Sequence, residues 1–156
     1  MKRSLLVCLA ICLITGVTAG TAMAQPTREQ YIAQADPVCA QSIQVQLNAL
    51  GGVVTDIKHR RFKKAAKKFR RTAGLLSSGI DQVAAIEPPP EDVALISAWI
   101  TALRREVPII KRFASALRKG NLGKLAKSNR QLQRAASAAP GLVQGYGFQA
   151  CDSLGA

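Results

Sequence analysis

Apolar residues recur at spacings of three and four through most of this chain, and that spacing is what most limits its fold. Such spacing places side chains on one face of an α-helix, and the strict alternation typical of strands is absent. The chain is therefore predicted to be all-α. The clearest series spans eight positions: Val93, Ile96, Ile100, Leu103, Val107, Ile110, Ala114 and Leu117.

Three more apolar series predict three further helices. The first follows Asp36-Pro37, a good N-cap and first-turn pair, and Thr27 with Gln30 forms a capping box for a short turn before it. The first series is Ala40, Ile43, Leu47, Leu50, Val54 and Ile57. The second is Phe62, Ala66, Phe69, Ala73, Leu76, Ile80 and Val83. The last is Leu122, Leu125, Asn129, Leu132, Ala136, Ala139, Val143 and Tyr146.

Turn-forming residues separate these series. The change of phase between the first two predicts a turn near Lys58–Arg61, and Gly51-Gly52 is the rival site. Prolines 88–90 end the second helix, and Gly120-Asn121 ends the third. Pro108 is expected to kink the third helix without ending it, and Pro140 to bend or fray the fourth.

The first 24 residues have the features of a secretory signal peptide. Lys2 and Arg3 precede an apolar run from Leu5 to Val17, and Ala22-Met23-Ala24 predicts cleavage before Gln25. An uncleaved membrane anchor is the alternative. Residues 25–156 are then predicted to form a single domain, secreted or held in the cell envelope.

Cleavage would leave two cysteines, Cys39 and Cys151, which in an exported chain most simply form one disulfide. Two free thiols or an intermolecular bridge are the alternatives. Closing so long a loop stabilises a fold by roughly 4–5 kcal/mol in the chain-entropy model. Four helices with short connections predict an up-down-up-down bundle, which would bring these two cysteines to the same end.

A resemblance agrees with this interpretation. Tyr31, Asp36, Cys39, Pro88-Pro89, Trp99 and Cys151 together resemble a group of uncharacterised small exported helical proteins from actinobacteria. The resemblance implies the fold and the export. It implies no activity and no functional residues.

Charge is distributed unevenly along the chain. Residues 58–71 contain nine Lys and Arg and no acid, and residues 104–134 contain ten with one acid. Placed on the predicted bundle, these two segments meet at the end far from the disulfide, with most acids at the other end. The candidate polyanion-binding residues are Lys58, Arg60, Arg61, Lys63, Lys64, Lys67, Lys68, Arg70, Arg71, Lys111, Arg112, Arg118, Lys119, Lys124 and Lys127.

This basic end predicts a non-enzymatic protein that binds anionic polymers of the cell envelope or its surroundings, or an anionic membrane surface. Binding would proceed by charge neutralisation with release of counterions. Phe62 and Phe69 belong to the core series, so sequence-specific recognition of nucleic acid is not predicted. The alternative is a protein-interaction or envelope-structural module of unknown partner, whose charge serves only solubility.

Catalytic and metal-binding patterns are not recognisable. His59 is the only histidine, beside Lys and Arg, and is predicted to be a surface residue. Glu91-Asp92 is interpreted as an acidic helix start. Asn129 is predicted to be a buried polar residue that fixes helix register, or else to line a pocket. We therefore expect no enzyme activity, cofactor or metal.

Overall fold

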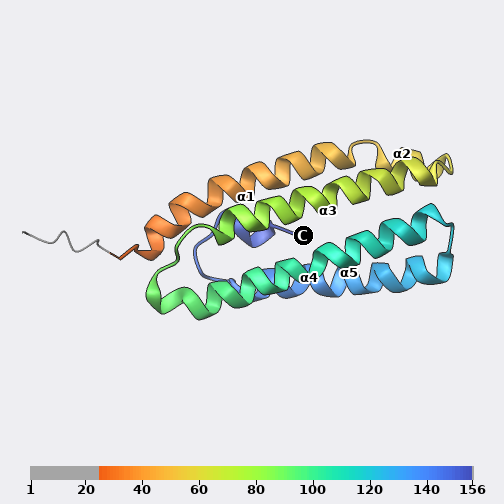
Figure 1. Ribbon diagram of the computed structural model, residues 1–156. Helices are drawn as coiled ribbons and strands as arrows, with labels where there is room; N and C mark the ends of the chain where they lie inside the picture. Colours follow the sequence, from red (N-terminus) through yellow and green to blue (C-terminus); the bar gives the residue numbers. More distant parts are fainter. Residues whose placement is uncertain (1–24, 156) are drawn as a thin grey trace, which may run out of the picture.

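A computed structural model describes residues 25–155 of the chain (Figure 1). The predicted signal peptide, with Cys8 and Cys12, lies outside the described residues. The described part is all-helical, and the predicted disulfide between Cys39 and Cys151 is present, with Cα atoms 5.0 Å apart. Its elements are α1 (Arg28–Leu50), α2 (Val53–Lys58), α3 (Phe62–Ala84), η1 (Pro90–Asp92), α4 (Val93–Arg118), α5 (Leu122–Leu142) and η2 (Cys151–Ser153).

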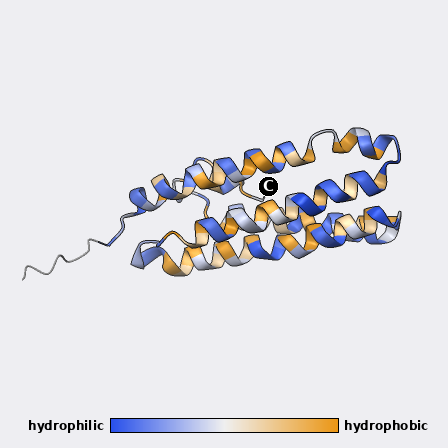
Figure 2. Ribbon diagram, turned by 45° about the horizontal axis from the view of Figure 1, so that its top comes forward, coloured by the Kyte–Doolittle hydropathy of each residue, from blue (hydrophilic) through white to orange (hydrophobic). Residues whose placement is uncertain are grey.

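Four long helices, α1, α3, α4 and α5, pack along a common axis, and successive ones run back and forth along it (Figure 1). α3 packs on both α1 and α4, and α4 also packs on α5. α1 and α5 make no extensive contact with each other in residues 25–155. The short η2 helix contacts both of them instead. Hydrophilic residues dominate the first half of α3, near its turn from α2 (Figure 2).

The core lies mainly between α1, α3, α4 and the C-terminal segment. Its largest fully buried side chains include Trp99, Tyr31, Leu76, Ile80 and Leu103. A second, smaller cluster lies near α2 and is built on small side chains, with Phe69 and Phe113 stacked edge to face at 4.8 Å. The predicted α4 series is buried apart from Val93, which is 46% exposed.

Both candidate turns between the first two predicted helices are real. α1 ends before Gly51-Gly52, where Gly52 takes the left-handed conformation with φ +67°. The short α2 follows, and a second turn at residues 59–61 includes Arg60 with φ +55°. The two predicted turn sites therefore lie on either side of a separate short helix, α2.

The predicted start of the first helix at Asp36-Pro37 is wrong. The Thr27–Gln30 capping box begins α1 itself, and the helix continues through Pro37. Proline cannot donate to the carbonyl one turn earlier. Here Pro37 and Ala33 are both exposed, so water can reach that carbonyl without breaking the helix.

Asp36 caps a different part of the chain from the one predicted. Its carboxylate accepts hydrogen bonds from the backbone N–H groups of Gln149, Ala150 and Cys151 at 2.8, 3.1 and 3.0 Å. Beside it, Cys39 is disulfide-bonded to Cys151. Asp36 and the disulfide together fix the C-terminal segment onto the middle of α1.

The rotation of α1 differs from the predicted one. Its buried residues are Tyr31, Ala35, Cys39 and Ser42, whereas Leu47 is 59% exposed. The disulfide and the aromatic contacts of Tyr31 with Tyr146 and Phe148 set this rotation. Of the predicted apolar series, Ile43, Leu47 and Leu50 line a pocket between α1 and α5, and Val54 and Ile57 belong to α2.

Asn129 is also placed differently from the prediction. It is exposed, and the buried polar residue on that part of α5 is its neighbour Ser128. A shift of one residue rotates a helix by about 100°, so a small phase error moved Asn129 from the core to the surface. None of the helices described in residues 25–155 is long and apolar enough to cross a membrane.

Candidate functional site

The basic residues near α2 surround a buried carboxylate. Asp56 is only 1% exposed and lies 2.9 Å from Arg61 Nε, 3.5 Å from Lys64 Nζ and 2.5 Å from Lys68 Nζ. The hydrogen bond from Lys68, with these three charges, lowers the pKa of Asp56 despite its burial. Most acids were predicted to lie at the other end of the bundle, but Asp56 lies among the basic residues and pairs with three of them.

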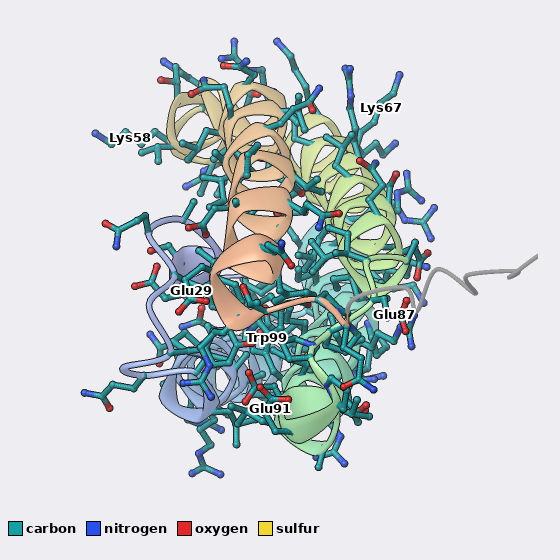
Figure 3. All side chains as sticks on the ribbon, turned by 90° about the vertical axis from the view of Figure 1, so that its left-hand side faces the viewer. Glu29, Lys58, Lys67, Glu87, Glu91 and Trp99 are labelled. Carbon is teal, nitrogen blue, oxygen red and sulfur yellow. A yellow bond between two sulfur atoms is a disulfide. The ribbon has the colours of Figure 1, made fainter. Side chains whose placement is uncertain are left out.

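This arrangement divides the candidate residues of the α2–α3 region into two groups. Arg61, Lys64 and Lys68 form an ion-pair cluster with the buried Asp56, in which Lys68 is mostly buried whereas the Arg61 and Lys64 side chains stay 48% and 62% exposed. The others are exposed on the outer faces, and Figure 3 shows Lys58 and Lys67 pointing outward. The exposed group is Lys58, Arg60, Lys63, Lys67, Arg70 and Arg71.

The second basic segment forms a concave surface between α4 and α5. One pocket there, of about 440 Å³, is lined by Arg112, Lys119, Lys124 and Lys127 with Ser115, Ala116, Ser128 and Gln131. A pocket of about 360 Å³ adjoins it, shares Arg112 and Gln131, and adds Arg105 and Arg134. We name the two together the α4–α5 groove; its cations are Arg105, Arg112, Lys119, Lys124, Lys127 and Arg134.

The charge of the α4–α5 groove is uncompensated. No acidic side chain lines it, and none of its six cations forms an ion pair within residues 25–155. Glu106 is the acid of α4, but it is fully buried, and burial raises its pKa to about 8. At pH 7 it is therefore mostly protonated and adds little negative charge to α4.

The groove also carries hydrogen-bonding groups among its cations. Ser115 and Ser128 offer hydroxyls, and Gln131 offers an amide between the two pockets. Guanidinium and ammonium groups make strong charge-assisted hydrogen bonds to phosphate, sulfate and carboxylate oxygens. The surface has the groups needed to bind a chain of anionic units.

The candidate residues are thus only partly brought together. Arg112, Lys119, Lys124 and Lys127 meet in the groove, whereas Lys111 and Arg118 are exposed outside its lining. Two groove cations, Arg105 and Arg134, were not among the candidates. Their spacing could have revealed them, since positions 105, 112 and 119 are seven apart, as are 127 and 134, and so share a helix face.

A second ionic cluster lies at the opposite end of the bundle. Arg28 forms two hydrogen bonds with the buried Asp92, at 2.9 and 2.7 Å, and Tyr146 donates a third at 2.8 Å. Arg28 and Tyr146 lower the pKa of Asp92, and burial raises that of Tyr146. Asp92 precedes α4, as predicted, but its carboxylate joins α1 to the C-terminal segment.

His59 is exposed, as predicted. In residues 25–155 no group of three His, Cys, Asp or Glu side chains could hold a metal ion. Comparison with protein-family models, curated proteins and solved structures finds no match to this chain.

Proposed function

We propose that the protein is exported, has no enzymatic activity and binds anionic polymers through the α4–α5 groove. One observation carries this proposal: six cations line a concave surface that contains no acid. Like charges held close together repel one another. A bound polyanion would replace that repulsion with attraction and release its own counterions.

The α2–α3 region supports this choice of surface by contrast. Its three cations around Asp56 are partly neutralised by that carboxylate, and its other cations lie on outer helix faces rather than in a pocket. These exposed cations add to the general field that attracts an anion. The groove supplies the contacts.

Recognition would follow charge and not base sequence. Phe69, an aromatic residue of the basic segment, is stacked on Phe113 at 4.8 Å and helps to form the smaller core cluster. It is therefore not free to stack on a base. Acidic polysaccharides and phosphate-containing envelope polymers share the chemistry that the groove would bind.

The predicted export fits this function. A disulfide is typical of proteins that fold in an oxidising compartment, and Cys39–Cys151 joins the middle of α1 to the C-terminal segment. Outside the cytoplasm, anionic polymers are abundant on the cell surface and in its surroundings. Direct detection of the processed chain in the culture medium or envelope, beginning at Gln25, would test this part of the proposal.

Retention on a heparin column, eluted with a salt gradient, tests the binding proposal. The test variant replaces Arg112, Lys124 and Lys127 with Gln, and the matched control replaces Lys63, Lys67 and Arg70. Both remove three positive charges and leave the Asp56 cluster intact. We expect the test variant to elute at much lower salt than the control, which should stay close to the unmodified protein.

Two results would overturn the proposal. Equal loss in both variants would show that only net charge matters, which is the behaviour of a solubilising surface. Unchanged retention of the test variant would show that the anion binds elsewhere. A variant that includes Lys64 or Lys68 is unsuitable, since it would remove one of the three cations paired with the buried Asp56 and so change stability as well as surface charge.

A further inference from the structure

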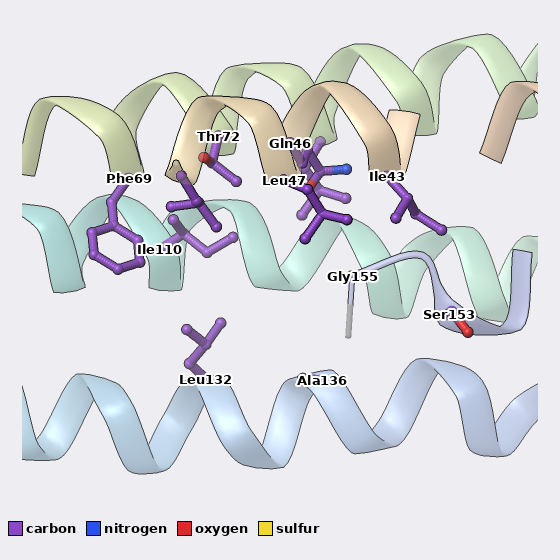
Figure 4. A pocket seen from close by; sticks show the side chains of 12 residues that line it. Ile43, Gln46, Leu47, Phe69, Thr72, Ile110, Leu132, Ala136, Ser153 and Gly155 are labelled. Carbon is purple, nitrogen blue, oxygen red and sulfur yellow. The ribbon is translucent and has the colours of Figure 1, made fainter. Parts of the chain in front are cut away.

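The gap between α1 and α5 contains an apolar pocket of about 170 Å³ (Figure 4). All four long helices and the C-terminal segment contribute to it. Its lining residues are Ile43, Gln46, Leu47, Leu50, Phe69, Thr72, Leu76, Ile110, Leu132, Ala136, Ser153 and Gly155. The exposed Leu47 belongs to this lining, on the α1 side.

The pocket continues a space that the C-terminal segment partly fills. Along α4, Trp99 is covered by Phe148, with ring centroids 5.3 Å apart. Two turns later Glu106 is covered by Gly155, where an added Cβ would lie 2.5 Å from a carboxylate oxygen. One turn further on, Ile110 lines the pocket. The segment thus fills the gap as far as Gly155, and the pocket lies beyond.

The lining favours an apolar group inside the pocket. Among the described residues it includes no charged side chain, and its polar members are Gln46, Thr72 and Ser153. The Thr72 hydroxyl already donates to the Lys68 carbonyl oxygen at 3.1 Å. A cavity of about 150 Å³ lined by Leu, Ile and Phe stays dry and accepts benzene. A pocket of this size can therefore hold an apolar group of about six carbons.

Positive charge lies just beyond one end of this pocket. Leu50 lines the pocket, and the carbonyl oxygen of the next residue, Gly51, accepts a hydrogen bond from Lys68 Nζ at 2.6 Å. Lys68, Lys64 and Arg61 share the single carboxylate of Asp56, which leaves two positive charges in excess. The chain from Pro37 to Thr55 has no charged residue that would repel an anion.

We propose that this pocket binds the alkyl chain of a fatty acid, which lies between α1 and α5 with its carboxylate towards Lys64 and Lys68. The apolar lining, the size of the pocket and the excess positive charge at one end all fit this ligand. The proposal is independent of the anion-binding function of the α4–α5 groove, because it uses different residues on another side of α5.

Titration calorimetry with straight-chain alkanoates of four to twelve carbons, kept below micelle-forming concentrations, tests this inference. Each methylene that enters the pocket should strengthen binding about fourfold. The gain should level off once about six carbons are enclosed. Alkylamines of equal length should bind at least tenfold more weakly than alkanoates, because the cluster beyond Leu50 repels them.

Variants of the lining locate the ligand. Ala136→Phe fills the pocket from α5, and Leu47→Glu places a carboxylate at an exposed position of its lining, where the fold tolerates it. Leu142→Glu is the control, because Leu142 is also an exposed leucine, at 41%, but does not line the pocket. We expect both lining variants to lose at least tenfold in alkanoate affinity and the control to lose none.

Several outcomes would overturn the inference. They are affinity that does not depend on chain length, equal binding of amine and carboxylate, and full binding by both lining variants. Sedimentation velocity adds another: a dimer that Leu47→Glu dissociates would show that a second copy of the chain occupies the pocket. Heparin retention of the lining variants is measured as well. We expect it to be unchanged, so that a failure of the fatty-acid proposal can be told apart from a failure of the anion-binding proposal.

Discussion

Replacement of the buried Glu106 by glutamine should stabilise the protein at neutral pH. Glu106 is completely buried, and neither of its carboxyl oxygens has a hydrogen-bond partner within residues 25–155. Burial raises its pKa from 4.5 to about 8. Glutamine has nearly the same shape but never ionises, so it removes the energy of keeping a proton on the buried carboxyl.

The size of the effect follows from the two pKa values. Between pH 4.5 and 8 the folded protein holds a proton on Glu106 that the unfolded chain releases. Stability therefore falls as pH rises through this window, by about 1.4 kcal/mol per unit. At pH 7 the loss is about 3 kcal/mol, and above pH 8 it levels off at about 5 kcal/mol. Glu106→Gln should recover these amounts.

Urea denaturation of the oxidised protein and of Glu106→Gln at pH 5, 7 and 9 measures this difference. The two proteins should have similar stability at pH 5 and should separate progressively at pH 7 and 9. Parallel pH profiles would refute the reasoning, because they would mean that Glu106 has an ordinary pKa in the fold.

Three further changes test other parts of the structure. Gly79→Ala places a Cβ 2.1 Å from the Ser42 hydroxyl oxygen and should destabilise the α1–α3 contact by about 1–3 kcal/mol, which Ser42→Gly should partly restore in thermal denaturation. Asp36→Ala removes the acceptor of three backbone N–H groups and should speed hydrogen exchange at residues 149–151 while the disulfide remains. Asp92→Asn should reduce stability above pH 4, and the loss should shrink as pH falls below 4, because a carboxylate with a lowered pKa contributes stability that is lost on acidification; a loss in urea denaturation that stays constant from pH 6 downwards would contradict this.

The sequence predicted the helical fold and the disulfide because both depend on local or pairwise features. The α4 series has one dominant apolar face, and tertiary contacts had little to change there. α1 has no such face. Its first half buries Tyr31 and Cys39, whereas the apolar residues of its second half face the pocket beside α5. Only the disulfide and the aromatic cluster decide between these faces.

The sequence predicted which segments carry the candidate site, but not which of their side chains meet on one surface. Runs of Lys and Arg in the sequence reveal where charge is dense, but not which cations point together. Asp56, two residues before the first run, becomes the buried ion-pair partner of three of its members. Arg105 and Arg134 enter the α4–α5 groove because two helix faces meet, which depends on how α4 and α5 pack.

Amide chemical shifts of isotope-labelled protein, titrated with a short oligomer of linear polyphosphate, test the central claim most directly. The account predicts that the largest changes fall on residues that line the α4–α5 groove, such as Ser115, Lys119, Ser128 and Gln131, and that they disappear in moderate salt. Changes centred on the outer face of α3, or spread evenly over all basic residues, would contradict it.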